Sequence, residues 1–254
     1  AGGSRGMSGA AYLCAKAAYR SGCGLVYIYT PECNRTILQQ LIPEAVLITY
    51  DEEAPDPEHF ADALKGKDAI VIGCGLGRSE FPSELTKRAL MSMLPCIADA
   101  DALNLIAADP YLTEVCDTYY MKGSPLIITP HEAEMARLCG CTVQEIGSSR
   151  REKAEKYSQE HRVITVLKGH ETIITDGWNT SFNTTGNHGM ATGGSGDVLA
   201  GVIGSLLAQG LGAYDAARLG AYIHGMAGDR VKSIRGTYSM MAGDIAENIL
   251  YGIE

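Results

Sequence analysis

The sequence lacks any excess of positive charge and any long uninterrupted apolar run. Its 21 Lys and Arg residues are outnumbered by 30 Asp and Glu residues, which gives a formal net charge of −9. Such a surface repels phosphate backbones and anionic lipids, so we exclude general nucleic-acid and membrane binding. The longest uncharged run, Val198–Tyr214, is broken by Gly201, Gly204 and Gly210. It predicts a buried helix followed by a turn, and not a membrane span.

Paired cysteine motifs are also missing. The sequence has eight cysteines, but no two form a C-x-x-C pair and none stands at the spacing of a zinc site. We therefore expect eight free thiols in a reducing compartment. The sequence shows no signal-peptide pattern, and we expect a cytoplasmic protein.

Glycine is abundant, at 30 of 254 residues, and it separates short apolar runs from longer segments of helical period. This alternation predicts an α/β fold with a mainly parallel sheet and helices on both faces, formed by residues 1–254 as a single domain. The expected strands are 26–30, 45–49, 69–73, 96–99, 126–129, 163–167 and 172–175, the last two forming a hairpin with 178–183 as a third antiparallel strand. The expected helices are 8–21, 33–41, 56–65, 81–94, 131–138, 149–160, 197–209, 213–233 and 239–252.

The strongest local signal is a glycine-rich segment, Thr192–Gly201, which runs into an uncharged helical stretch. Glycines let the backbone approach an anion, which the N–H groups of the segment and of the helix start can bind. Asp197 lies in the first helical turn, where the helix dipole favours a carboxylate. An ordinary N-capped helix after a glycine turn explains the same pattern. A Walker A loop is excluded, because no Gly-Lys-Ser/Thr follows.

Other polar residues follow predicted strands, and we expect them at one edge of the sheet. His131 and Glu134 stand three apart at a helix start, where a carboxylate can hold Mg²⁺ through water or simply face solvent. Lys168 suits a phosphate contact, although lysine is also common at strand ends. Asp99 and Asp101 follow a third strand. The isolated histidines are interpreted as structural or exposed: His59, His161, His188 and His224.

Taken together, these motifs resemble the ribokinase-like superfamily and, within it, the NAD(P)H-hydrate dehydratases. The resemblance covers nearly the whole chain. It implies a three-layer sandwich and a carbon–oxygen lyase that uses ADP or ATP, with Mg²⁺, to dehydrate the S epimer of hydrated NADH and NADPH. It also implies a homo-oligomer, a tetramer. The segments that carry it are 2–11, 20–26, 75–78, 99–104, 129–134, 167–169 and 192–201.

The resemblance implies roles for single residues. Asp197 is expected as the general base, and the N–H groups of Gly194, Ser195 and Gly196 are expected to stabilise the transferred phosphoryl group. Glu134 is expected to position Mg²⁺ through water. Contacts with the hydrated dinucleotide are expected from Ala10, Gly75, His131, Glu134 and Asp197. Contacts with the nucleotide are expected from Lys168, Gly169, His170, Glu171, Thr172, Asn187, Thr192, Gly193, Gly194, Ser195 and Gly196.

The chain departs from the family pattern at its first residues. The strand that normally precedes Gly2-Gly3-Ser4 is absent, so we expect an incomplete sheet edge. Trimming from a bifunctional epimerase–dehydratase and simple shortening explain this equally well. The kinases of the superfamily carry Asn-x-x-Glu where this chain has His131-x-x-Glu134, which favours the dehydratase.

Two other functions remain open. One is a kinase of a small alcohol, such as a thiamin or pyridoxal precursor, which uses the same Asp and glycine loop but leaves a stable phosphorylated product. The other is a nucleotide-binding regulatory protein without turnover, which would have no need of the base.

Overall fold

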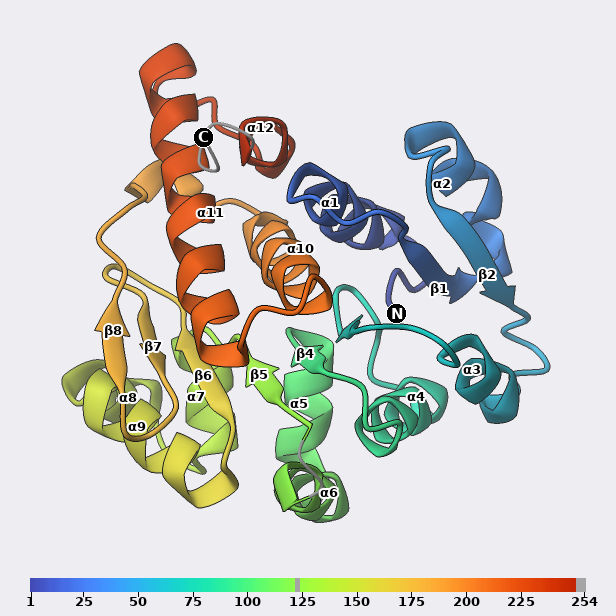
Figure 1. The fold of residues 1–254 in the computed structure, drawn as a ribbon, viewed down its shortest axis with the longest axis horizontal. Coiled ribbons are helices and arrows are strands. Elements are labelled where there is room, and N and C mark those ends of the chain that lie inside the picture. Colours follow the sequence, from blue (N-terminus) through green and yellow to red (C-terminus); the bar gives the residue numbers. More distant parts are fainter. Residues whose placement is uncertain (122–123, 250–254) are drawn as a thin grey trace.

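The protein is described from a computed structural model, which covers residues 1–121 and 124–249. Its central feature is a sheet of six strands in the order β3-β4-β5-β6-β7-β8 (Figure 1). The first four strands run parallel, and the last two are antiparallel to their neighbours. The mainly parallel sheet and the terminal hairpin with its third strand are thus confirmed. The bounds are β3 Ile70–Ile72, β4 Cys96–Ala98, β5 Leu126–Ile128, β6 Ile164–Leu167, β7 Ile173–Thr175 and β8 Thr180–Phe182.

Helices cover both faces of this sheet and give three layers (Figure 1). One side holds α1 (Ser8–Arg20), α10 (Ser195–Ala208), α11 (Ala213–Arg235) and α12 (Ala242–Glu247). The other side holds α3 (Pro57–Ala63), α4 (Glu80–Met91), α5 (Asp101–Ala108), α6 (Pro110–Met121), α7 (Glu132–Leu138), α8 (Val143–Ser148) and α9 (Arg150–His161). A second sheet pairs β1 (Tyr27–Pro31) in parallel with β2 (Val46–Tyr50), next to a 3-10 turn (Glu32–Asn34) and α2 (Arg35–Leu41).

Three helices were not expected from the sequence. Helix α5 begins directly after Ala100, whose left-handed φ of 47° no local pattern announces, and α6 follows at once. Helix α8 does carry a signal, the capping box of Thr142 and Glu145. The helix predicted over 239–252 is shorter, because α12 ends at Glu247; residues 250–252 lie outside the described part of the chain.

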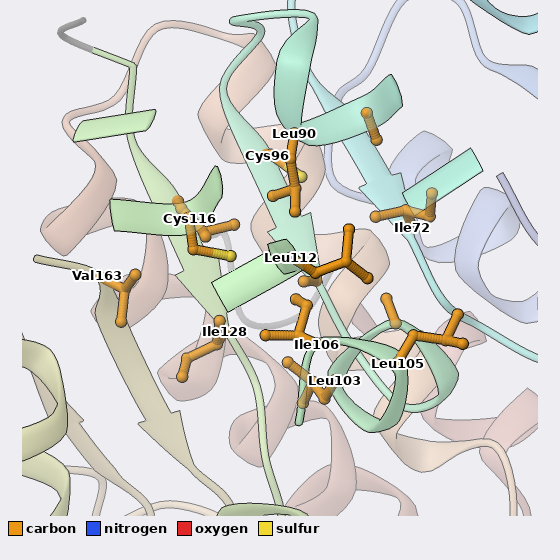
Figure 2. Close-up of a cluster of buried hydrophobic side chains, with 14 of the residues drawn as sticks. Ile72, Leu90, Cys96, Leu103, Leu105, Ile106, Leu112, Cys116, Ile128 and Val163 are labelled. Carbon is orange, nitrogen blue, oxygen red and sulfur yellow. The ribbon is translucent and has the colours of Figure 1, made fainter. Parts of the chain in front are cut away.

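One apolar core fills the space between the sheet and the layer of α4 to α9. Figure 2 shows strand residues beside residues of α5 and α6, all at most 2% exposed: Ile72, Cys96, Ile128, Leu103, Ile106 and Leu112. Each fully buried aliphatic side chain of this kind stabilises the fold by about 1.5–3 kcal/mol. This core holds the strand ends at one edge of the sheet.

A second core lies on the opposite face, where α10 is enclosed between the sheet and α1. A side chain at Gly201 would meet the Cys14 carbonyl oxygen at 2.1 Å, and one at Gly204 would meet Val71 Cγ2 at 2.4 Å. Glycine at these two positions lets α10 approach α1 and β3 closely. The uncharged run is therefore a buried helix, as predicted, and its start is fixed at the sheet edge.

A slot separates the two sheets. The Ala1 ammonium donates to the Val71 carbonyl oxygen (2.7 Å), and the Gly73 N–H donates to that of Ala1 (3.3 Å), which is the pattern of a parallel strand pair. On the other side, the Gly2 N–H donates to the Tyr29 carbonyl oxygen at 3.1 Å. A cavity of about 490 Å³ lies along β1 and β3 here, between α1, α10 and α3. Ala1 is thus paired like a strand residue between β1 and β3.

All eight cysteines lie within the described residues, and none is paired in a disulfide, as predicted. Among the helices of residues 1–121 and 124–249, none has the length and apolar character needed to cross a bilayer.

Candidate active site

The candidate site lies at the carboxyl edge of β4, β5 and β6, where one polar residue follows each strand. Asp99, Thr129 and Lys168 are these residues, and the strand order brings them together. The Thr129 hydroxyl and the Lys168 ammonium both donate to Asp99 Oδ1, each at 2.7 Å. Asp99 is only 1% exposed. The predicted meeting of strand-end residues at one edge is confirmed, and its centre is a buried ion pair.

Glu134 joins this pair from α7. Its Oε2 lies 3.8 Å from Lys168 Nζ, and the residue is 6% exposed. Burial disfavours the charged form of Lys168, but the carboxylates of Asp99 and Glu134 outweigh burial and raise the pKa of its ammonium. Two carboxylates therefore share one cation.

The start of α7 is a complete capping box. His131 Nδ1 accepts from the N–H groups of Ala133 (3.1 Å) and Glu134 (3.3 Å), while Glu134 Oε2 accepts from the His131 N–H at 2.8 Å. Glu134 is buried, so the interpretation of a solvated acidic helix start is wrong. Its second oxygen, Oε1, takes no part in the box.

The start of α10 is the opposite case. Gly194 precedes the helix with a left-handed φ of 89°, and no side chain caps the helix. Within the described residues, the Ser195 N–H donates a long bond (3.3 Å) to the Thr192 carbonyl oxygen, but no acceptor is found for the N–H groups of Gly194, Gly196 and Asp197. An ordinary N-capped helix would satisfy such donors. This helix start is therefore open to an anion.

Gly196 brings the α10 start to the ion pair. A side chain there would lie 3.3 Å from Lys168 Nζ and 3.6 Å from Asp99 Oδ2. The missing side chain keeps the space between the N–H groups and the ammonium free. Positive charge from Lys168 and the unsatisfied donors of α10 thus meet at one point.

Asp197 faces the same point from the first turn of α10. Its carboxylate, the Asp99 carboxylate and the Cys74 sulfur have ligand atoms within 4.8 Å of one another. Burial, followed by the Asp99 carboxylate, raises the pKa of Asp197 to about 6. A carboxylate with this pKa can take a proton near neutral pH.

The Ser195 side chain contacts His224, which the sequence analysis interpreted as structural or exposed. His224 Nε2 lies 3.3 Å from Ser195 Oγ, and His224 is 9% exposed. Burial lowers the pKa of His224 to about 4, so the ring is neutral at physiological pH. It belongs to the wall behind the α10 start.

Two of the expected dinucleotide contacts, Ala10 and Gly75, lie against each other. A side chain at Gly75 would approach Ala10 Cβ to 3.0 Å and Met7 Cβ to 2.9 Å, at a φ of 58°. The segment is held by the Ser4 N–H, which donates to the Gly75 carbonyl oxygen at 2.6 Å. Cys74, which precedes Gly75 in this segment, has its sulfur within 4.8 Å of a carboxylate oxygen of Asp197.

The other expected nucleotide contacts occupy two separate loops. The β6–β7 turn contains Gly169 to Thr172, and the Arg150 guanidinium donates to the carbonyl oxygens of His170 (2.6 Å) and Lys168 (3.3 Å). Asn187 is held on α11 by Asp229 (2.9 Å). Among described contacts, Lys168 links the turn to the α10 start, and none links His170, Glu171 or Asn187 to Asp197.

Sequence reasoning did not assign a role to Asp99, Cys74 or His224. Asp99 was noted at a strand end, but its neighbour Asp101 binds elsewhere: it accepts from the Gly77 N–H (2.9 Å) and pairs with Arg78 (2.8 Å). The contacts of Cys74 and His224 join segments far apart in the chain, and no local pattern indicates them.

Residues 1–250 match the family described as NAD(P)H-hydrate dehydratase. The chain belongs to this family. It is 41% identical over 263 residues to the bifunctional NAD(P)H-hydrate repair enzyme Nnr of Moorella thermoacetica, a match that covers 98% of this chain and 48% of the relative. It is 38% identical over 258 residues to the ADP-dependent (S)-NAD(P)H-hydrate dehydratase of Neisseria meningitidis, covering 96% of this chain and 80% of that protein. The chain spans about half the length of the bifunctional relative.

A solved structure gives the same assignment. The ADP/ATP-dependent NAD(P)H-hydrate dehydratase from Bacillus subtilis, co-crystallized with ATP/Mg²⁺ and soaked with CoA, superposes with a TM-score of 0.85 at 28% identity, over 99% of this chain and 88% of that chain. The fold is the ribokinase-like α/β fold, as the resemblance implied.

Proposed function

We propose that this chain dehydrates the S epimer of hydrated NADH and NADPH to the intact cofactors, at the expense of ADP or ATP. The observation that carries the proposal is the pairing of Asp197 with an uncapped helix start beside Lys168. A base and an anion site at one point are what phosphoryl transfer to a hydroxyl requires.

The reaction follows from these groups. Asp197 takes the proton of the hydrate hydroxyl. The oxygen of that hydroxyl attacks the terminal phosphorus of the nucleotide, and the bond from that phosphorus to the rest of the nucleotide breaks. The N–H groups of Gly194 and Gly196 stabilise charge on the transferred group; that of Ser195, already bonded to Thr192, contributes less. The lone pair of the ring nitrogen then expels phosphate, and a proton leaves the adjacent carbon to restore the double bond.

The remaining residues hold the two substrates. Ala10, Gly75, His131 and Asp197 bind the hydrated dinucleotide, which the contact between Ala10 and Gly75 supports. The nucleotide lies on Lys168 and the rest of the β6–β7 turn (Gly169, His170, Glu171, Thr172), on Asn187 and on the glycine-rich segment (Thr192, Gly193, Gly194, Ser195, Gly196).

Mg²⁺ accompanies the nucleotide, and the oxygen donors of this chain fit it. Glu134 Oε1 lies outside the hydrogen bonds of the capping box, 3.3 Å from His131 Nε2, and a single carboxylate with water suits an ion that retains its hydration. Glu134 would hold the ion through water. When bound, Mg²⁺ neutralises charge on the phosphate oxygens.

Residues 1–254 act as one dehydratase domain, in the cytoplasm and as a homotetramer.

The decisive assay incubates the protein with chemically hydrated NADH, Mg²⁺ and either ADP or ATP. The dehydratase restores the absorbance of reduced nicotinamide and releases one phosphate per cofactor. A kinase of a small alcohol, offered thiamin or pyridoxal precursors, leaves a stable phosphorylated product instead. A nucleotide-binding regulator gives a rise in melting temperature with nucleotide but no turnover, which would overturn the proposal.

A further inference from the structure

Cys74 is a buried thiol at the centre of the candidate site that the proposed reaction does not use. It follows β3, is 2% exposed, and its sulfur lies within 4.8 Å of carboxylate oxygens of Asp99 and Asp197. Thiol and carboxylate ligands of three separate segments therefore converge at one point below the α10 start.

The charges around this point are unbalanced. The Lys168 ammonium pairs with the carboxylates of Asp99 and Glu134, and the Asp197 carboxylate lies within 4.8 Å of that of Asp99. The ammonium and the Thr129 hydroxyl both use Asp99 Oδ1, and no donor in the described part of the chain reaches Asp99 Oδ2. The cluster carries excess negative charge, and Asp99 Oδ2 accepts no hydrogen bond from the described residues.

We propose that Cys74, Asp99 and Asp197 form a binding site for a thiophilic divalent cation such as Zn²⁺, and that the bound ion inhibits the enzyme. The inhibition rests on the proposed function, because the ion occupies the carboxylate of Asp197 that acts as the base. Binding of the ion does not depend on the proposed function.

The chemistry of the three ligands fits such an ion. With bonds of about 2.3 Å to sulfur and about 2.0–2.2 Å to oxygen, tetrahedral coordination places ligand atoms roughly 3.5 Å apart. The present separations, up to 4.8 Å, close by side-chain movements of about an ångström. The thiol of Cys74 loses its proton to solvent as the metal–sulfur bond forms, and water takes the fourth position. A soft thiolate selects Zn²⁺ over Mg²⁺, which prefers oxygen ligands.

Co²⁺ tests binding without any assay of activity, because a thiolate–cobalt bond absorbs in the near ultraviolet. We expect one equivalent of Co²⁺ to give this band in the wild-type protein and in Cys33→Ser, which removes an exposed cysteine. Cys74→Ser should give no band, and excess Mg²⁺ should not displace the ion. No band in the wild-type protein, or an undiminished band in folded Cys74→Ser, would overturn the proposal.

A second variant keeps the test decisive if Cys74→Ser fails to fold. Asp197→Asn retains the thiol and loses one ligand, so Co²⁺ affinity should fall at least about tenfold, since even outer partners of metal ligands cost about 10–100-fold. Unchanged affinity would exclude Asp197 as a ligand.

Turnover assays with Zn²⁺ address the inhibitory role separately. We expect Zn²⁺ to inhibit the wild-type enzyme, a chelator to restore activity, and Cys74→Ser to be less sensitive by about tenfold or more. A cobalt band in a protein that never dehydrates hydrated NADH would refute the proposed function and leave the metal site standing. Dehydration that Zn²⁺ does not inhibit would refute the inhibitory role.

Discussion

The starts of α7 and α10 face the same site and are built in opposite ways. His131 and Glu134 satisfy the first N–H groups of α7 through a reciprocal pair of hydrogen bonds. At α10, glycines replace capping side chains, and the N–H groups of Gly196 and Asp197 find no acceptor in the described part of the chain. Because unsatisfied donors near a protein interior are costly, their presence indicates a ligand that completes them. The start of α7 is closed by its own side chains, whereas the start of α10 leaves donors free for a ligand.

The largest effect should follow from Asp197→Asn, which removes the base but keeps the shape of the α10 start. Turnover should fall by about 10²–10⁴-fold, while nucleotide affinity changes only a few-fold. Because the pKa of Asp197 is raised to about 6, the folded state binds its proton more tightly than the unfolded chain does. The carboxylate therefore destabilises the fold at neutral pH, and the variant should gain up to about 2 kcal/mol.

Asp215→Asn is the matched control, since Asp215 also lies in the first turn of a long helix, α11, but is exposed. It should leave turnover unchanged. Steady-state kinetics and urea unfolding measure both variants. Full activity of Asp197→Asn would remove Asp197 from the mechanism, and equal losses of turnover and nucleotide binding would make it a structural residue.

Lys168→Met should give the next largest effect, on stability. The substitution leaves the buried Asp99 carboxylate without its cation. Removing one partner of a buried ion pair lowers the free energy of unfolding by about 3 kcal/mol. Urea unfolding should show this loss, whereas Lys65→Met, which breaks the exposed pair with Asp62, should show none. A Lys168→Met protein as stable as the wild type would contradict a stabilising role of this buried pair.

The strands could be predicted well from the sequence, because short apolar runs that end at glycine, proline or charged residues leave little choice for where a strand begins and ends. Strands β1 to β7 begin and end within one residue of their predicted positions. Helix α5 was missed because it begins after Ala100, whose positive φ of 47° no local sequence pattern indicates. The position of Asp99 at a strand end was predictable, but its pairing with Lys168 depends on β4, β5 and β6 being neighbours.

The glycine-rich segment was the best signal for the site, although the sequence left open whether it was an ordinary cap. The same glycines can form a simple turn before a capped helix or leave backbone N–H groups free for an anion. Only the three-dimensional positions of Gly194 and its neighbours distinguish these two interpretations. Similarly, His131-x-x-Glu134 was recognised as a motif, but its reciprocal bonds required coordinates.

The pH dependence of turnover should distinguish the base from the scaffold. Ionised Asp197 is the active form, so kcat/KM should rise with pH and level off above about pH 6, where the pKa lies. Below that value it should fall about tenfold per pH unit. A rate that is flat between pH 5 and 7 would contradict the assignment.

Gly194→Ala tests whether α10 needs its uncapped geometry. The new methyl group would lie 2.4 Å from Leu13 Cδ1, at a φ of 89° that L-residues avoid, so we expect a loss of roughly 1–2 kcal/mol and weaker nucleotide binding. Gly193→Ala is the control for stability, since φ is not positive there and nothing lies within 4 Å of the added group. Thermal unfolding with and without ADP measures both, and equal melting temperatures would contradict the prediction.

The smallest effect should appear at α7, where His131 has two separable roles. His131→Ala removes the cap of the helix and should cost about 1 kcal/mol. His131→Asn restores a good capping side chain, so its stability should stay within a few tenths of a kcal/mol of the wild type. If the ring also contacts the hydrated dinucleotide, both variants should raise KM for the hydrate while leaving KM for ADP unchanged. Wild-type kinetics in His131→Asn, together with a stability loss in His131→Ala, would assign His131 to the cap alone and leave α7 wholly as scaffold.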